Sequence, residues 1–261
     1  METSGLEMIY VTEADTPKPA VNLNNPRLYG HILCPFVEKV RMALAARNVV
    51  YQRCEVDLGK KTPWHIEING GMVPVWELPD GTILTESKVL MDYVEEAYPD
   101  QGYSLLPKDP VLRAKMRIGT NLVDALNGAW FPLYMKKSFP AEEFKPIIEK
   151  LQKIEDFIKA NGNEASPFAL GTENPTQLDA HIYTHVERLN MMNGSVWHDG
   201  VWVQSGFHNF PLTIKLLEGI RARPEFRGIL ANPKPWHEFY ERVAAKPSGE
   251  RVHLYLPISN E

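Results

Sequence analysis

RLYGHILCPFVEKVRMALAARN, residues 27–48, is the stretch of the sequence that decides the fold. RLYGH predicts a short strand, ILCP a turn, and FVEKVRMALAARN a helix. Apolar side chains of that helix recur at the spacing that places them on one face, at Phe36, Val40, Ala43 and Leu44. The stretch therefore predicts a strand-turn-helix unit that carries a cysteine, Cys34, in its turn.

Three segments after this unit continue the mixture of strands and helices. YQRCEVDL at 51–58 predicts a strand, VPVWELPDGTIL at 73–84 predicts two strands about an Asp-Gly turn, and ESKVLMDYVEEAY at 86–98 predicts a helix. The buried stripe of that helix is expected at Val89, Leu90, Tyr93, Val94 and Ala97. This order implies a small mixed sheet with helices packed on it, a thioredoxin-like α/β domain over residues 27–102.

The flanking segments differ in pattern from this domain. Residues 1–26 show no sustained periodicity, and Pro17 and Pro19 exclude a regular helix, so we expect a loosely ordered extension. QGYSLLPKDP at 101–110 has the composition of a linker. After it the sequence shows successive amphipathic helices and no convincing strand. We expect an all-helical domain over residues 111–250, which makes the fold class α/β followed by all-α.

The composition of the chain excludes several classes of function. Its 261 residues carry a formal net charge of -5, with Lys and Arg scattered along the chain, so nucleic acid is not an expected partner. No run of about 18 apolar residues is present to span a bilayer. The opening METSGLEMIYVTEADTPKPA carries acids where a secretion signal would be basic. We therefore expect a soluble, cytoplasmic protein with no membrane span.

Cys34 is the first candidate for chemistry. It follows a strand and precedes Pro35, a residue suited to the first helical position, so the thiol would lie at the helix N-cap. Backbone N–H groups and the positive end of the helix dipole lower the pKa of a thiol at that position and favour the nucleophilic thiolate. The alternative is a small buried side chain, as free cysteines often are. The strand-Cys-Pro-helix setting favours the reactive interpretation.

The other cysteine and its spacing limit that chemistry. Cys34 and Cys54 are too few for a disulfide framework and lack the paired spacing of a zinc site, so no metal is expected. Cys54 lies in a predicted strand and is expected in the core. Position 37 is Val37, so there is no Cys-x-x-Cys pair. A second, external thiol would have to release a mixed disulfide on Cys34.

The motifs CPF, MVPV and TES, at 34–36, 72–75 and 85–87, follow one another in an order and spacing that resemble the amino-terminal domain of the glutathione transferases. A cysteine in place of a catalytic Tyr or Ser is similar to the omega class, as is a proline-containing extension before the first strand. The resemblance implies glutathione as cosubstrate, Cys34 as the catalytic residue and a homodimer.

The resemblance also implies a glutathione site. The bond between Val73 and Pro74 would be cis, and the Val73 backbone would pair with the cysteinyl backbone of glutathione. The alternative for Pro74 is an ordinary edge-strand proline. Lys61 would meet the glycyl carboxylate, with Lys60 as the alternative.

Further positions match the family's site. Glu86 and Ser87 correspond to its pair for the γ-glutamyl end, where N–H groups and a hydroxyl hold a carboxylate and an acid takes up an ammonium; a simple helix cap is the alternative. Phe36 matches an aromatic that lines the site, with helix packing as its alternative. Trp130 and Tyr134 would line the second-substrate pocket, with a place in the core as the alternative.

Two further motifs are interpreted as structural. Thr176 and Asp179 form a Thr-x-x-Asp box ahead of an apolar run, which is typical of a helix start. His181 and His185 stand one helical turn apart as metal ligands would, but no third ligand is evident.

Three functions remain open at this point. The leading hypothesis is a glutathione-dependent thiol transferase or reductase acting on glutathionylated proteins, small disulfides or dehydroascorbate. The second is conjugation of glutathione to electrophiles, in which Cys34 would matter less. The third is a non-enzymatic binding module, similar to the chloride intracellular channel proteins or translation-factor subunits. Against a channel, the helix after Cys34 carries the charges of Glu38, Lys39 and Arg41.

Overall fold

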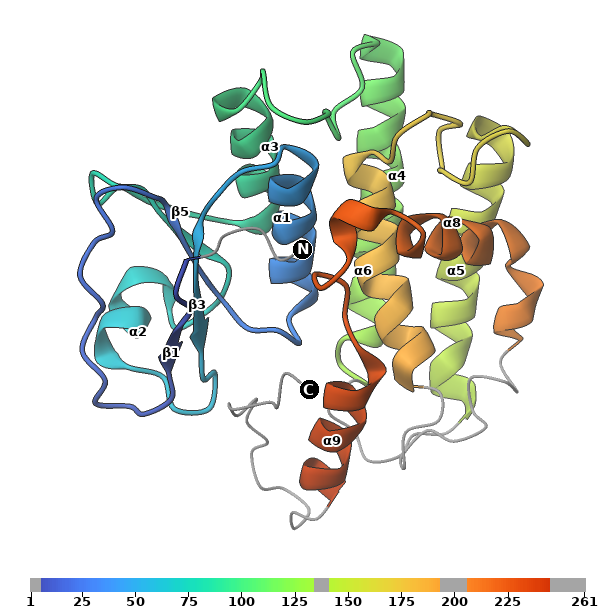
Figure 1. Cartoon of the computed structure of the whole chain (residues 1–261). Helices are drawn as coiled ribbons and strands as arrows, with labels where there is room; N and C mark the ends of the chain where they lie inside the picture. The colour runs from blue at the N-terminus through green and yellow to red at the C-terminus, as the bar shows by residue number, and fades with distance from the viewer. Residues whose placement is uncertain (1–5, 134–140, 193–205, 245–261) are drawn as a thin grey trace. The chain divides into compact units, whose positions relative to one another are not determined.

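The computed structural model describes residues 6–133, 141–192 and 206–244, and its described residues group into two compact units (Figure 1). The first unit runs to Tyr103 and includes a short segment, Arg227–Ala231, from much later in the chain. The second unit holds the described residues of Ser104–Phe226 and of Asn232–Pro247. Strands occur only in the first of the two, within the described ranges, so an α/β domain followed by a helical region is confirmed.

The first unit contains a five-stranded mixed sheet within its described residues, in the order β1-β3-β2-β4-β5. The strands are β1 (Ile9–Val11), β2 (Arg27–Gly30), β3 (Gln52–Val56), β4 (Val75–Glu77) and β5 (Ile83–Thr85). β1, β3 and β2 run parallel, whereas β4 is antiparallel to both of its neighbours, β2 and β5. The predicted hairpin is confirmed, and the Thr82 N–H donates to Asp80 Oδ1 in its turn at 2.9 Å.

Helices cover both faces of this sheet. α1 (Pro35–Ala46) and α3 (Ser87–Ala97) pack against each other on one face, and α2 (Pro63–Asn69) lies on the other (Figure 1). Trp64 and Ile68 of α2 pack on a cluster of strand side chains, Val11, Tyr29, Cys54, Val56 and Val75. The burial of this apolar surface holds the unit together.

The expectation of a loosely ordered extension is wrong at Ile9–Val11, which forms β1 at the edge of the sheet. β1 pairs in parallel with β3, and Val11 lies opposite Val56. A strand of three residues is too short to show an alternating pattern, so no periodicity in the sequence predicts it. Beyond it, the Trp64 indole N–H donates to the Thr16 carbonyl at 2.9 Å and holds the extension against α2.

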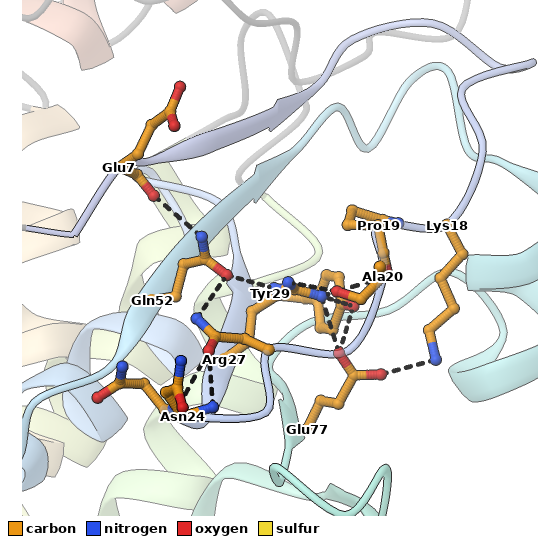
Figure 2. A network of polar contacts seen from close by, with 11 residues as sticks. Glu7, Lys18, Pro19, Ala20, Asn24, Arg27, Tyr29, Gln52 and Glu77 are labelled. Atoms are coloured by element: carbon orange, nitrogen blue, oxygen red, sulfur yellow. Dashed lines mark hydrogen bonds and ion pairs between the residues drawn. The ribbon is translucent and has the colours of Figure 1, made fainter.

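A buried polar network joins the rest of the extension to the sheet (Figure 2). The Arg27 guanidinium donates to Glu77 Oε2 at 2.9 Å and to the Ala20 carbonyl at 2.7 Å. Tyr29 donates its hydroxyl to the same Glu77 oxygen at 2.8 Å, and Lys18 pairs with the other oxygen at 2.7 Å. Burial is the main reason that the pKa of Tyr29 is raised. Two buried charges, from neighbouring strands, thus fix a segment that has no regular structure of its own.

The buried face of α3 differs from the predicted stripe. Val89, expected inside, is 55% exposed, and Ala97 is also exposed. Glu95 is buried instead, because Arg47 at the end of α1 donates to its Oε2 at 2.5 Å. Hydrophobic periodicity alone does not reveal a charged partner on another helix, which is why the prediction was displaced by part of a turn.

The segment Arg227–Ala231 joins the first unit through charged side chains of α1. The Ala231 N–H donates to Glu38 Oε1 at 2.6 Å, and Arg41 Nη2 donates to the Gly228 carbonyl at 3.3 Å. Both side chains are buried. The charges that argued against membrane insertion therefore serve to bind a distant part of the chain.

The second unit is helical throughout its described residues. Its elements are α4 (Pro110–Trp130), η1 (Ala141–Phe144), α5 (Lys145–Asn161), α6 (Gln177–Met192), η2 (Phe207–Asn209), α8 (Pro211–Arg221), η3 (Pro224–Phe226) and α9 (Pro233–Ala244). α6 packs against α4, α8 and α9, and it is the central helix of the unit (Figure 1).

The predicted box at the start of α6 is confirmed. The backbone N–H and the hydroxyl of Thr176 both donate to Asp179 Oδ2, at 2.6 and 2.7 Å. The other Asp179 oxygen accepts the Ala169 N–H at 2.7 Å, so one carboxyl also fixes the preceding loop. No helix in the described ranges is apolar and long enough to cross a membrane.

Candidate functional site

Three loops that are distant in sequence leave the sheet at one end. Tyr29 of β2 lies opposite Val75 of β4, which lies opposite Thr85 of β5, so these residues form one row across the sheet. One step beyond that row the chain reaches Gly30, Pro74 and Glu86, the entrances to the three loops. The register therefore brings the Cys34 turn, the Val73-Pro74 segment and the start of α3 to the same edge.

The parallel strands end at this edge as well. Gly30 at the end of β2 lies opposite Glu55 of β3, and the Asp57 N–H donates to the Val11 carbonyl at 2.8 Å. The loop that carries Lys60 and Lys61 follows directly. Ligand sites of α/β sheets commonly lie at the carboxyl ends of their parallel strands.

The turn before α1 places Cys34 at the N-cap, as the sequence predicts. The Cys34 N–H donates to the His31 carbonyl at 2.9 Å, and the Cys34 carbonyl accepts the Glu38 N–H at 3.0 Å. Pro35 occupies the first helical position, and Cys34 is half-buried. The side chain therefore stands at the positive end of the helix dipole, the position where a thiolate is stabilised.

His31 is a residue of this turn whose role the sequence analysis missed. Its Nδ1 accepts the Leu33 N–H at 3.1 Å, so the ring closes the turn from within, and the residue is fully buried. Nearby, burial opposes ionisation of Glu55, but Arg53, Arg41 and His31 outweigh that effect and lower its pKa. A histidine followed by a hydrophobic pair carries no sequence signal for such a closing contact.

The bond between Val73 and Pro74 is cis, as the resemblance implied. Val73 is half-buried, and Pro74 is buried directly ahead of β4. Of the two lysines considered for this site, Lys60 pairs with Glu13 at 2.8 Å. Lys61 lies instead over the turn that leads to Val73, where its Nζ donates to the Gly70 carbonyl at 3.5 Å.

Glu86 and Ser87 open α3 with an unusual backbone. Glu86 is the N-cap and has φ 68° and ψ 105°, a backbone conformation that residues other than glycine rarely adopt. Such strain costs about 1–3 kcal/mol and is concentrated at ligand sites. Glu86 is exposed, whereas Ser87 is buried at the first helical position.

The aromatic candidates lie in both units. Phe36 is half-buried on α1, and the Lys39 ammonium lies 4.9 Å from the centre of its ring. Trp130 at the end of α4 is buried, and its ring centre is 6.1 Å from that of His185 on α6. Tyr134 lies outside the described residues. That Trp130 and Tyr134 line a second-substrate pocket remains a prediction.

Two histidines on α6 have the spacing of a metal-binding pair. His181 and His185 are buried on α6 with their ring centres 6.1 Å apart. Within the portion of the chain that the structure describes, no three His, Cys, Asp or Glu side chains are grouped as a metal site would require.

Comparison with known proteins agrees with this geometry. Residues 28–102 match the family model described as the glutathione S-transferase N-terminal domain. The chain is 28% identical to glutathione S-transferase omega-1 of Rattus norvegicus over 195 residues, 72% of this chain and 77% of the relative. It is 31% identical to the probable glutathione S-transferase BZ2 of Zea mays over 166 residues, 59% of this chain and 70% of the relative.

The fold also extends over both units in solved structures. Glutathione transferase Omega 1C from Trametes versicolor superposes with a TM-score of 0.69 at 22% identity, covering 85% of this chain and 97% of that one. The matched amino-terminal domain contains the sheet edge that carries the Cys34 turn, Val73 and the start of α3. The chain is 31% identical to the Zea mays glutathione S-transferase and covers 70% of it, and its amino-terminal residues match the family model. The chain therefore belongs to the glutathione S-transferase family.

Proposed function

We propose that this protein is a glutathione-dependent thiol transferase or reductase in which Cys34 is the nucleophile. The observation that supports it is the position of Cys34 at the N-cap of α1, at the sheet edge shared by Val73 and Ser87. The similarity to omega-class relatives, among them the omega-1 enzyme of Rattus norvegicus, supports the same assignment.

The site residues have separate roles in this proposal. Backbone groups of Val73 bind the cysteinyl part of glutathione, and Glu86 and Ser87 bind its γ-glutamyl end. Lys61 binds the glycyl carboxylate. Lys61 is favoured over Lys60 for this role because Lys60 pairs with Glu13. Phe36 lines the site. Trp130 and Tyr134 line the pocket for the second substrate.

The reaction follows from a single thiol. The Cys34 thiolate attacks the glutathionyl sulfur of a mixed disulfide, so that a Cys34–glutathione disulfide forms and the substrate leaves as a thiolate that takes up a proton. A second glutathione thiolate then attacks the glutathionyl sulfur on Cys34. Oxidised glutathione leaves and the Cys34 thiolate is regenerated. The substrate is reduced by two electrons, and two glutathione units are joined, one of them from the substrate.

The decisive experiment compares Cys34→Ser with Cys54→Ser. Turnover of the mixed disulfide of glutathione and mercaptoethanol is followed by coupling oxidised glutathione to glutathione reductase. We expect Cys34→Ser to lose about 100-fold or more, because a hydroxyl cannot form the intermediate, while Cys54→Ser retains turnover within about twofold. Equal turnover in wild type and Cys34→Ser would remove Cys34 from the mechanism.

The same variants separate the proposal from its alternatives. Conjugation of glutathione to chlorodinitrobenzene that survives in Cys34→Ser, in a protein that turns over no mixed disulfide, would favour the conjugating function. A wild-type protein that is retained on immobilised glutathione but catalyses neither reaction would favour a binding module. Mass spectrometry after exposure to oxidised glutathione should find one glutathionyl adduct, on Cys34.

A further inference from the structure

The Met72 carbonyl, one residue before Val73, is held by two side chains of α2. His65 Nε2 lies 3.0 Å from the Met72 oxygen, and Asn69 Nδ2 donates to the same oxygen at 3.2 Å. The Met72 N–H donates to the Asn69 carbonyl at 3.0 Å. Both backbone polar groups of Met72 are therefore fixed by α2.

This contact determines the direction of the next N–H group. The carbonyl of Met72 and the N–H of Val73 belong to one peptide unit, which is planar and trans, so the two groups point in opposite directions. Side chains that fix the Met72 oxygen consequently fix the Val73 N–H. The proposed contact between Val73 and glutathione is made by the Val73 backbone and not by its side chain, so the direction of this N–H determines whether the contact forms.

His65 is well held for that role. His65 is only 2% exposed, and its backbone N–H donates to Thr62 Oγ1 at 3.3 Å. Its ring centre is 5.6 Å from that of Trp64. Burial lowers its pKa, so the neutral ring is favoured near neutral pH. A carbonyl only accepts hydrogen bonds, so the proton of the neutral ring must be on Nε2.

The loop between α2 and Met72 explains why side chains are needed here. Gly70 and Gly71 have φ of 59° and 67°, two consecutive left-handed residues that turn the chain away from the helix. A Cβ at Gly71 would come within 2.4 Å of Lys61 Cδ, so the lysine stem packs directly on this turn. The chain leaves the turn with Met72 exposed, and the two bonds from α2 restrain its carbonyl.

We propose that His65 and Asn69 are positioning residues that orient the Val73 N–H for glutathione. This inference rests on the proposed function, because it names what aligns one of its binding groups. His65 and Asn69 touch neither substrate nor Cys34 in this scheme and act through the peptide between Met72 and Val73. Losing them should weaken glutathione binding and leave the nucleophile on its separate loop intact.

The test uses His65→Phe, which keeps a planar ring but has no donor, and His65→Gln, whose amide nitrogen can donate at a similar reach. For His65→Phe we expect the KM for glutathione to rise about tenfold, because the hydrogen bond to the Met72 carbonyl is lost. The kcat should stay within about twofold of wild type. His65→Gln should bring KM back to within about threefold of wild type. The rate of Cys34 alkylation by iodoacetamide should be unchanged in both variants.

Asn69→Ala provides a second readout that does not depend on the buried ring. Asn69 is only partly buried, and we expect its loss to raise KM about threefold without changing Cys34 alkylation. If His65→Phe does not fold, Asn69→Ala decides the question. Unchanged KM in folded His65→Phe or in folded Asn69→Ala overturns the positioning role while the proposed function stands. A wild-type protein that shows no saturation with glutathione would overturn the proposed function itself.

Discussion

The two cysteines of this chain occupy opposite environments in the same small domain. Cys34 is half-buried at the start of α1, directly before Pro35 and beyond the end of β2. Cys54 lies within β3, fully buried among strand side chains such as Tyr29 and Val75. Burial raises the pKa of the Cys54 thiol to about 12.

The difference teaches that position, and not residue type, decides which thiol can react. At a helix N-terminus the backbone supplies partial positive charge that stabilises a thiolate. Inside an apolar cluster the same anion would lose its hydration without compensation, so the thiol stays protonated. The sequence already separated the two cysteines, because only Cys34 stands between a strand and a helix that begins with proline.

Alkylation of the native protein is the strongest test of this comparison. Cys54 is fully buried, and burial raises the pKa of its thiol, so it should react with iodoacetamide only when the domain opens, and Cys34 should react about 10³-fold faster or more. Peptide mass spectrometry at timed intervals measures both rates in one sample. Similar rates for the two cysteines in folded protein would contradict the assignment of the reactive thiol.

Arg27→Met is a way to break the protection of Cys54 without touching Cys34. Arg27 is 3% exposed and its partner Glu77 is 1% exposed, so the substitution removes the buried cation and leaves the Glu77 carboxylate with only Lys18 and the Tyr29 hydroxyl as partners. We expect the free energy of unfolding to fall by about 3–5 kcal/mol. Because alkylation of a buried thiol proceeds through opening of the domain, Cys54 labelling should accelerate by about 100-fold or more.

Lys60→Met is the matched control for this substitution. Lys60 and Glu13 form an ion pair with both side chains exposed, and such pairs contribute at most about 1 kcal/mol. Urea denaturation compares the stabilities, and the alkylation rates of Cys34 should change little in either variant. Equal losses of stability in the two variants would show that the extension is not held by the buried network of Figure 2.

A smaller effect concerns His65, which responds to burial in the opposite direction from Cys54. Burial disfavours the charged form of both groups, so it raises the pKa of Cys54 and lowers that of His65. Below about pH 6.5 the unfolded chain takes up a proton on His65 before the folded protein does. The free energy of unfolding therefore falls as the pH falls through this window, by at most about 1.4 kcal/mol per pH unit.

Urea denaturation between about pH 5 and pH 8 checks this sign. The pH dependence of wild type should be steeper on the acid side than that of His65→Gln, which has no titrating ring. The remaining histidines are common to both proteins, so the difference isolates His65. Parallel curves for the two proteins would mean that His65 titrates alike in the folded and unfolded states.

Local signals predicted more of this molecule than long-range ones. The N-cap position of Cys34 follows from residues adjacent in sequence, and so does the box of Thr176 and Asp179. By contrast, the buried position of Glu95 depends on Arg47 in another helix. The pattern of apolar residues in one helix does not reveal a charged partner in another helix. The prediction that Val89 is buried on α3 is therefore wrong.

The candidate site shows the same limit. Motif order identified the segments, whereas their meeting at one edge follows from strand register, which relates Tyr29, Val75 and Thr85 only in the folded sheet. His65 is a further example, since its role depends on the Met72 carbonyl across a turn of two glycines.

The segment Arg227–Ala231 has a consequence for biosynthesis. Glu38 and Arg41 on α1 bind the backbone of Ala231 and Gly228, so the first unit draws on residues that the ribosome adds only after α8. Domains generally fold as units in the order in which they leave the ribosome. Here the amino-terminal unit acquires its last contacts only after most of the helical region has emerged from the exit tunnel, so nascent chains stalled before residue 227 should carry an incomplete first unit.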